Sequence, residues 1–274
     1  MPVVATNTAA NSALRFLNYN SSQAQNSVSK LASGSRIVKA SDDAAGLAIG
    51  TKLKGDVTVL AQAGINAAQG ASMIQVADGG LARVSDVLQR MKALAAQSLS
   101  GVPSNAERAF IDAEYQELAL EIAGIAETTR FNGESLLDGT KAAAVDFFVG
   151  TATGDNISVD FTVDYSASAT MTATAEDVTT ATNAAAAMTA VDADIAVVNE
   201  ARATFGAQIS RFEFRGQQIA TSMENIDAAK SSIMDVDLAA EQSRLVSNQV
   251  LVQAAVSAVS QANQIPQSLL RVLQ

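Results

Sequence analysis

The chain has no cysteine, no histidine and no tryptophan among its 274 residues. Zinc, haem, iron–sulfur and thiol chemistry therefore lose their usual ligands, and histidine bases and Ser-His-Asp triads are excluded. No disulfide framework is possible, so cysteine pairing indicates nothing about the cellular compartment. The glycines are scattered and form no phosphate-binding motif. We predict a protein that is not an enzyme and that uses no metal and no cofactor.

Charge is scarce at both ends of the chain. The net charge of −10 argues against a nucleic-acid partner. Residues 1–41 contain no acid, residues 141–194 carry eight acids and one base, and residues 245–270 carry no charge. The uncharged stretch is too rich in Asn, Gln and Ser for a membrane span, so we expect no membrane insertion. We also expect export without a cleaved signal, because the first residues lack an apolar signal-peptide core.

Apolar residues recur at every seventh position in two long stretches, which is typical of long helices packed as a coiled coil. Because the chain goes out along one path and returns along another, the two halves must run antiparallel. We predict a mainly α protein, a long antiparallel coiled-coil helical rod built from both chain ends, with a small β-hairpin element. The rows are Leu53, Leu60, Ala67, Ile74, Leu81, Leu88 and Ala95, and Val191, Val198, Phe205, Phe212, Ile219, Ile226 and Ile233.

Local signals set the expected boundaries of these helices. Ser41-Asp42-Asp43 predicts the start of a helix that runs to about Ser100, with Gly79-Gly80 as a candidate bend. A third helix follows the turn at Pro103, and the long C-terminal helix is expected to begin near Val191.

The middle of the chain changes pattern. Residues 157–163 alternate between apolar and polar side chains, which predicts a half-buried strand with Asp146–Gly150 as its partner. We therefore expect a β-hairpin near 145–165. Residues 166–190 are mostly Ala, Thr and Ser, which predicts a variable surface formed by loop or weak helix.

Three carboxylate pairs are the candidates for chemistry: Asp42/Asp43, Glu176/Asp177 and Asp235/Asp237. Adjacent or i,i+2 residues do not share a helix face, and none of the pairs has calcium-loop spacing. We interpret them as helix caps and solvated positions.

The heptad rows of residues 44–234 are interpreted as an intramolecular core. The ends differ, because residues 1–40 and 235–274 combine an apolar stripe with a Gln, Asn, Ser and Thr face that has few charges. Such helices favour burial on more than one side, against copies of the same chain. The predicted self-association residues are Leu14, Leu17, Val28, Leu31, Leu245, Val252 and Val259.

Four motifs resemble bacterial flagellin and fall in its order along the chain. Residues 31–37 (LASGSRI) with 40–49 (ASDDAAGLAI) resemble the N-terminal signature, and residues 131–133 (FNG) with Leu136-Leu137 resemble the next landmark. Residues 202–207 (RATFGA) and 261–267 (QANQIPQ) resemble the C-terminal block and terminus. The resemblance covers roughly 1–140 and 190–274.

The resemblance implies a flagellar filament subunit with two domains, both made from the two chain ends. Residues 1–43 and 235–274 would form the inner-tube helices, called D0, and would contain the predicted self-association residues. Residues 44–234 would form D1, with the hairpin and the variable surface. No outer domain is expected, because only about 50 residues separate Gly139 from Val191. The D0 ends are expected to stay disordered until assembly.

The resemblance also implies partners and a location. Besides copies of itself, the chain would meet an export chaperone, the flagellar secretion apparatus, and hook-associated and cap proteins. It would be exported unfolded and would function outside the cell in the bacterial flagellar filament, for swimming motility. Arg90, Leu94 and Glu114 match positions through which flagellins bind Toll-like receptor 5. We expect these residues to serve subunit packing first.

Two other functions remain open from the sequence. A hook–filament junction protein would have similar ends. A membrane-active helical protein is suggested by residues 251–259, although its polar face would be rich in Gln and Ser rather than Lys and Arg.

Overall fold

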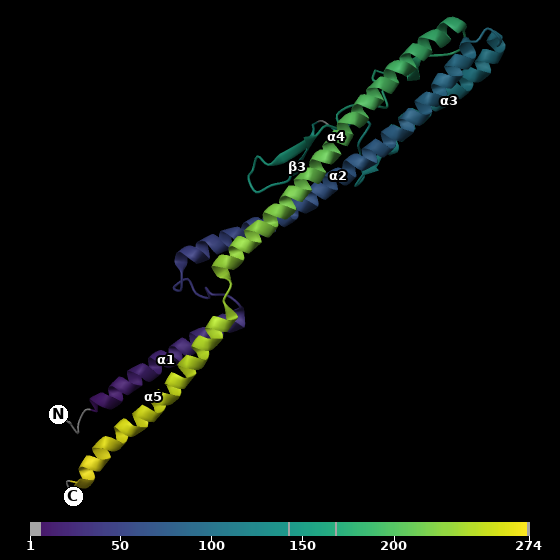
Figure 1. Cartoon of the computed structure of the whole chain (residues 1–274). Helices are drawn as coiled ribbons and strands as arrows, with labels where there is room; N and C mark the ends of the chain where they lie inside the picture. The colour runs from purple at the N-terminus through teal and green to yellow at the C-terminus, as the bar shows by residue number, and fades with distance from the viewer. Residues whose placement is uncertain (1–6, 142, 168, 273–274) are drawn as a thin grey trace. The chain divides into compact units, whose positions relative to one another are not determined.

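The computed structural model describes residues 7–141, 143–167 and 169–272, without the side chains of 265–272 (Figure 1). The chain forms two compact units, one from Thr58 to Glu224 and one that extends up to Val57 and resumes at Asn225. The domain boundaries expected at 43/44 and 234/235 stay a prediction, because they concern positions in a filament.

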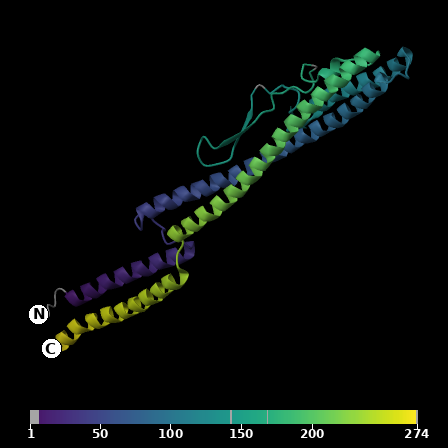
Figure 2. The same cartoon turned by 45° about the horizontal axis from the view of Figure 1, so that its top comes forward.

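The Thr58–Glu224 unit is built around an apolar seam between two helices. Helices α2 (Ala44–Leu99) and α4 (Ala181–Met234) both enter this unit and run antiparallel in it (Figures 1 and 2). Two ion pairs show the direction, since Asp78 pairs with Arg202 at 2.9 Å and, further along α2, Lys92 pairs with Asp192. Each fully buried Leu, Ile, Val or Phe side chain contributes about 1.5–3 kcal/mol. The mainly α prediction is confirmed, and within this unit the two rows are the core: Leu60, Ala67, Ile74, Leu81, Leu88, Ala95, Val191, Val198, Phe205, Phe212 and Ile219 are all buried.

Glycines allow close packing along α2. A Cβ at Gly70 would lie 2.7 Å from ring carbons of Phe212, so only glycine lets this ring reach the helix backbone. At Gly80 the side chains of Thr129 and Leu137 occupy the space that a Cβ would need. The helix runs through Gly79-Gly80 without a break, and the candidate bend there stays a prediction.

Helix α3 (Asn105–Thr128) returns along α2 and begins with a capping box. The Ser104 backbone N–H donates to the Glu107 carboxylate at 2.7 Å, and the Glu107 N–H donates to the Ser104 hydroxyl at 3.4 Å. The backbone hydrogen bond from Ser104 lowers the pKa of Glu107. Both partners thus satisfy groups that a helix end leaves unpaired.

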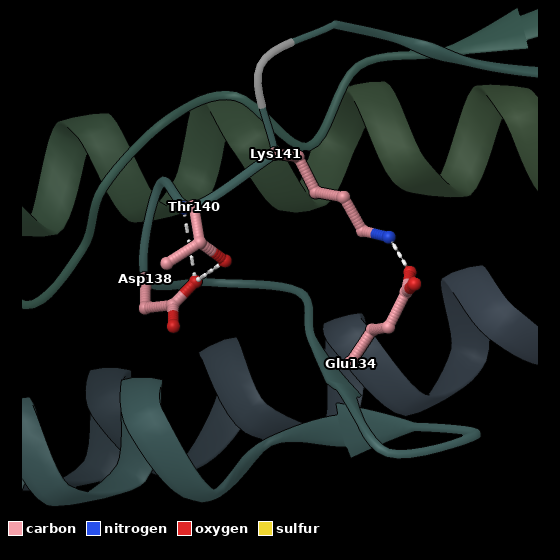
Figure 3. Close-up of polar contacts among 4 residues, drawn as sticks. All are labelled: Glu134, Asp138, Thr140 and Lys141. Carbon is pink, nitrogen blue, oxygen red and sulfur yellow. Dashed lines mark hydrogen bonds and ion pairs between the residues drawn. The ribbon is translucent and has the colours of Figure 1, made fainter.

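Two short hairpins follow α3. Strands β1 (Arg130–Phe131) and β2 (Glu134–Ser135) are joined by Asn132 and Gly133, which have φ values of 52° and 85°. Two successive positive φ values are typical of the tight hairpin turn that Asn-Gly favours. Beyond β2, the Thr140 N–H and hydroxyl donate to the Asp138 carboxylate at 3.1 and 2.7 Å, and Lys141 pairs with Glu134 (Figure 3).

The predicted hairpin is present but shorter than expected. Strand β3 (Val145–Phe148) pairs antiparallel with β4 (Asn156–Val159). The strand does not reach residue 163, because the Asp160 carboxylate accepts hydrogen bonds from the N–H and hydroxyl of Thr162 and so competes with the ladder. The Phe147 ring meets Phe212 of α4 edge-on, with centroids 5.4 Å apart.

The stretch 166–190 is more ordered than predicted. Helix α4 begins at Ala181 rather than near Val191, because Thr180 accepts a hydrogen bond from the Asn183 N–H at 3.2 Å and alanines that favour helix follow. A 3-10 turn, η1 (Thr172–Ala175), precedes it.

Asp194 of α4 holds η1 in place. Asp194 is only 1% exposed. Its carboxylate accepts three hydrogen bonds, from the N–H of Thr172 at 3.0 Å, the hydroxyl of Thr172 at 2.9 Å and the N–H of Ala173 at 2.8 Å. The Tyr115 hydroxyl of α3 donates to the Ala173 carbonyl at 3.0 Å, and burial raises the pKa of Tyr115. These contacts fix the connector between α3 and α4.

Replacing Asp194 tests this anchor. Asp194→Ala leaves the buried N–H of Ala173 and the part-buried N–H of Thr172 without acceptors, and it is expected to lower the free energy of unfolding by about 2–4 kcal/mol. Asp192→Ala removes only a half-exposed pair with Lys92 and is expected to cost less than about 1 kcal/mol. Urea unfolding of the full chain measures both, and equal stability of the two variants would contradict the anchoring role.

Candidate self-assembly interface

The terminal helices pair along their length in the other unit. Helix α1 (Thr8–Ser33) and helix α5 (Leu238–Val272) lie side by side and antiparallel (Figures 1 and 2). Asn7 caps α1 by accepting from the Ala10 N–H at 3.0 Å, and its amide donates to the Ala262 carbonyl at 2.8 Å. At the other end the Val236 N–H donates to the Gly34 carbonyl at 3.1 Å. Both ends of the pair are therefore fixed by hydrogen bonds.

The pairing buries little of the predicted apolar stripe. Leu245 is buried and Leu17, Leu31, Val252 and Val259 are half-buried. The side chains of Leu14 and Val28 remain 42% and 50% exposed. The structure thus brings the stripe residues of both ends into one unit but leaves part of their apolar surface exposed. Their contact with another copy stays a prediction. The buried α1 and α5 residues are mostly small: Ala10, Ser27, Ala255 and Ala262, besides Glu241 and Leu245.

An apolar groove of about 900 Å³ runs along the α1–α5 pair. Phe16 and Tyr19 stand on its α1 side, and Leu251 and a row of alanines form its α5 side. Phe16, Tyr19 and Leu251 are 65%, 61% and 49% exposed. Exposed aromatic residues beside a groove are typical of an interaction surface.

This groove was not predicted from the sequence, because the predicted self-association residues of α1 were those of the apolar stripe that contains Leu14 and Leu17. Phe16 and Tyr19 lie off that stripe. A usable signal was present, since two aromatic residues three positions apart share a helix face that is otherwise polar.

Helix α5 carries a second apolar set. Val246, Val250 and Val256 are 48%, 63% and 46% exposed, within a stretch that has no charge. A soluble helix normally covers such positions with Lys and Glu. Two different apolar surfaces on one helix pair suit contacts between unlike faces of successive copies.

The carboxylates at the helix junctions accept local hydrogen bonds, and two of them, Asp43 and Asp237, cap the helices that follow. Asp42 accepts from the N–H groups of Val38 at 3.1 Å and Lys39 at 3.0 Å, and these backbone hydrogen bonds lower its pKa. Asp43 accepts from the Gly46 N–H at 2.8 Å, and Asp237 accepts from the first turn of α5. Asp235 accepts from the Ser231 hydroxyl at 2.7 Å, and Asp177 from Thr179 and Asn183.

Metal binding and membrane insertion are two further properties on which the structure bears. In the ranges that the structure describes, no group of three or more acidic residues is placed to hold a metal ion. No helix over the same ranges has the length and hydropathy needed to cross a membrane.

The three residues matched to the receptor site lie on α2 and α3. Arg90 donates to the Glu114 carboxylate at 2.9 Å through Nε, and both side chains are about half exposed. Leu94 is only 2% exposed, so it belongs to the core of this chain. The structure brings Arg90 and Glu114 together and leaves the receptor role a prediction.

Paired, charge-poor terminal helices with uncovered apolar surfaces, attached to a well-packed helical core, define a class of self-assembling helical subunits. Comparison with known proteins identifies the family to which this subunit belongs. Residues 4–142 match the bacterial flagellin N-terminal helical region, and residues 188–273 match the bacterial flagellin C-terminal helical region. The chain belongs to the bacterial flagellin family.

Individual relatives agree over nearly the whole chain. A flagellin of Halalkalibacterium halodurans is 40% identical over 272 residues, which cover 99% of each chain. The flagellin of Bacillus subtilis is 37% identical, with 97% and 98% coverage, and a flagellar filament 30.7 kDa core protein of Treponema maltophilum is 33% identical, with 94% and 95% coverage.

Solved structures share the fold. The crystal structure of Bacillus cereus flagellin superposes with a TM-score of 0.52 at 29% identity, covering 61% of this chain and 94% of that one. A putative flagellar hook-associated protein from Vibrio parahaemolyticus gives 0.57 at 16% identity, covering 71% of this chain and all of that one, a likeness of fold alone.

The turn held by Asp42 gives a pH-dependent signal. Because the folded state lowers the pKa of Asp42, these hydrogen bonds contribute fully above the ordinary carboxyl pKa of about 4 and are lost as pH falls through the lowered pKa. We expect the amide protons of Val38 and Lys39 to lose protection from exchange on acidification. In Asp42→Asn, which keeps an acceptor oxygen but does not titrate, this protection should not change with pH. NMR-detected exchange measures the protection, and identical pH profiles of the two chains would contradict this role of Asp42.

Proposed function

We propose that this chain is the structural subunit of a bacterial flagellar filament and that it functions outside the cell as part of that filament, in swimming motility. The observation that carries the proposal is the uncovered, mostly apolar groove on two terminal helices that have few charges and none between residues 245 and 270. The family assignment supports it, because the relatives named above are flagellins and a filament core protein.

The physics of the groove favours a polymer. Phe16, Tyr19 and Leu251 would each contribute about 1–2 kcal/mol if another copy covered them, because only their exposed part would be newly buried. The groove and the surface around Val246 and Val250 are different surfaces. If the groove of one copy covers this surface of the next copy, the groove of that next copy stays free, so the contact does not close on two copies. Unlike contacts repeated by a screw operation build an open filament.

The finer parts of the proposal follow the family resemblance. Residues 1–43 and 235–274 would line the inner tube as D0, and 44–234 would form D1. The chain would pass unfolded through the secretion apparatus with a chaperone, and would join the filament beside hook-associated and cap proteins. Arg90 and Glu114 would contact a neighbouring subunit first and Toll-like receptor 5 second. The buried Leu94 would need to become accessible to contribute to receptor binding.

A hook–filament junction role is the weaker alternative. The likeness to a hook-associated protein is one of fold, whereas relatives at 37% and 40% identity over nearly the whole chain are named flagellins. A structural subunit also needs no turnover, which agrees with carboxylates that serve as helix caps. A membrane-active role gains no support from an α5 surface without cations between 245 and 270.

Leu251→Asp tests the groove directly. Leu251 is 49% exposed, so the change is expected to shift the free energy of unfolding of the monomer by less than about 1 kcal/mol. In a polymer it would bury an unpaired carboxylate at a cost of several kcal/mol per subunit. Light scattering after addition of filament seeds should show no growth.

Leu251→Met is the matched control, because it keeps an apolar side chain of similar size. This variant should polymerise like the parent chain. Normal growth of Leu251→Asp, with an unchanged monomer, would sink the assignment of the groove to assembly.

A further inference from the structure

Met234 is the point at which three segments of the terminal unit meet. Its carbonyl, at the last residue of α4, accepts from the Arg36 N–H at 2.7 Å and from the Ser35 hydroxyl at 3.0 Å. Its side chain lies directly on α2 at Gly50, where an added Cβ would overlap the thioether and lie 2.6 Å from Cγ. One residue therefore joins α2, the connector after α1 and the turn into α5.

The contact at Gly50 has no room for an extra atom between the sulfur of Met234 and the backbone of α2. Gly50 lies inside α2, so the backbone N–H groups around it are used by the helix. An oxygen on the side of the sulfur that faces Gly50 would overlap this backbone, and a sulfoxide is polar where the thioether packs as an apolar group. We therefore expect the oxidised side chain to turn away from Gly50 toward water.

Met234 is also reachable. The methionines of the other unit at 73, 91 and 171 are buried at 7% exposure or less, whereas Met188, Met223 and Met234 are half-buried. Among the described residues of the terminal unit, Met234 is the single methionine. Susceptibility to oxidation follows exposure, so these three residues react before the others.

We propose that Met234 is an oxidation site that switches off self-assembly. A peroxide transfers one oxygen atom to Sδ, which gives the sulfoxide and, from hydrogen peroxide, water; the sulfur loses two electrons and the peroxide gains them. The sulfoxide leaves Gly50 and loosens the hydrogen bonds from Ser35 and Arg36 that hold the start of α1's connector. The proposal rests on the assembly function for its consequence, but its structural step concerns the single chain.

The experiment compares the full chain with Met234→Leu and, as a matched control, Met223→Leu. Each is treated with hydrogen peroxide until peptide mass spectrometry shows sulfoxide at the half-buried methionines, and is then added to seeds. We expect the parent chain and Met223→Leu to lose growth rate by about tenfold or more, and Met234→Leu to keep it. Methionine sulfoxide reductase should restore the parent chain.

A second measurement separates this proposal from the filament function. Hydrogen exchange of the Arg36 amide in the treated monomer should speed up in the parent chain and in Met223→Leu, and not in Met234→Leu. Faster exchange at Arg36 supports the oxidation switch even if neither the parent chain nor any variant polymerises. Failure of the untreated parent chain to polymerise would instead count against the filament role. Unchanged exchange at Arg36, or equal loss of growth in Met234→Leu, would overturn the proposal.

Discussion

The apolar seam between α2 and α4 is the contact on which the rest of the chain depends. Its two rows are buried from Leu60 to Ala95 and from Val191 to Ile219. Because the helices run antiparallel, the same seam places the hairpin, η1 and α3 against surfaces that already exist. Glycine at position 70 is part of this arrangement, since it lets the Phe212 ring reach the backbone of α2 and meet Phe147 of the hairpin.

Much of this fold could be predicted from the sequence, because period and spacing encode it. The heptad rows indicated α2 and α4, and the alternation at 157–163 indicated a strand, of which the structure contains Asn156–Val159. Of the carboxylates interpreted as helix caps or solvated positions, Asp43 and Asp237 are caps, since an Asp before a helical pattern has one common use.

The elements that were not predicted correctly depend on contacts between residues distant in sequence. Nothing local shows that Asp194 will turn inward and hold Thr172 and Ala173, so the sequence predicted only loop or weak helix for residues 166–190. The early start of α4 follows from a threonine cap that an Ala- and Thr-rich stretch conceals. The groove beside Phe16 needed α5 as its second wall, and no pattern within α1 specifies that wall.

The two units satisfy the hydrophobic effect in different ways. The Thr58–Glu224 unit buries its large side chains within one chain, whereas the α1–α5 pair buries mainly small residues and leaves Phe16, Tyr19 and Val250 uncovered. A chain with this division can hold a stable fold while its ends retain a driving force for association. The scarcity of charge in α5 fits the same division, since a charge there would need a partner in every neighbouring copy.

The outer turn of the β3–β4 hairpin is a place where the chain can be lengthened without affecting the helices. Between Val149 and Asn156 the turn is held by the Asp155 carboxylate, which accepts from the N–H groups of Thr151 and Ala152, both at 3.0 Å, and by the Val149 N–H, which donates to the Asp155 carbonyl at 2.8 Å. The aromatic contacts that fix the hairpin involve Phe147 and Phe161, outside this turn. Gly154 has no neighbouring atom within 4 Å of where a side chain would begin. Extra residues beside Gly154 would cost loop entropy and the local hydrogen bonds of Asp155, but they would leave the aromatic contacts in place. A passenger peptide could therefore be carried there on each subunit without disturbing the helices beneath the hairpin.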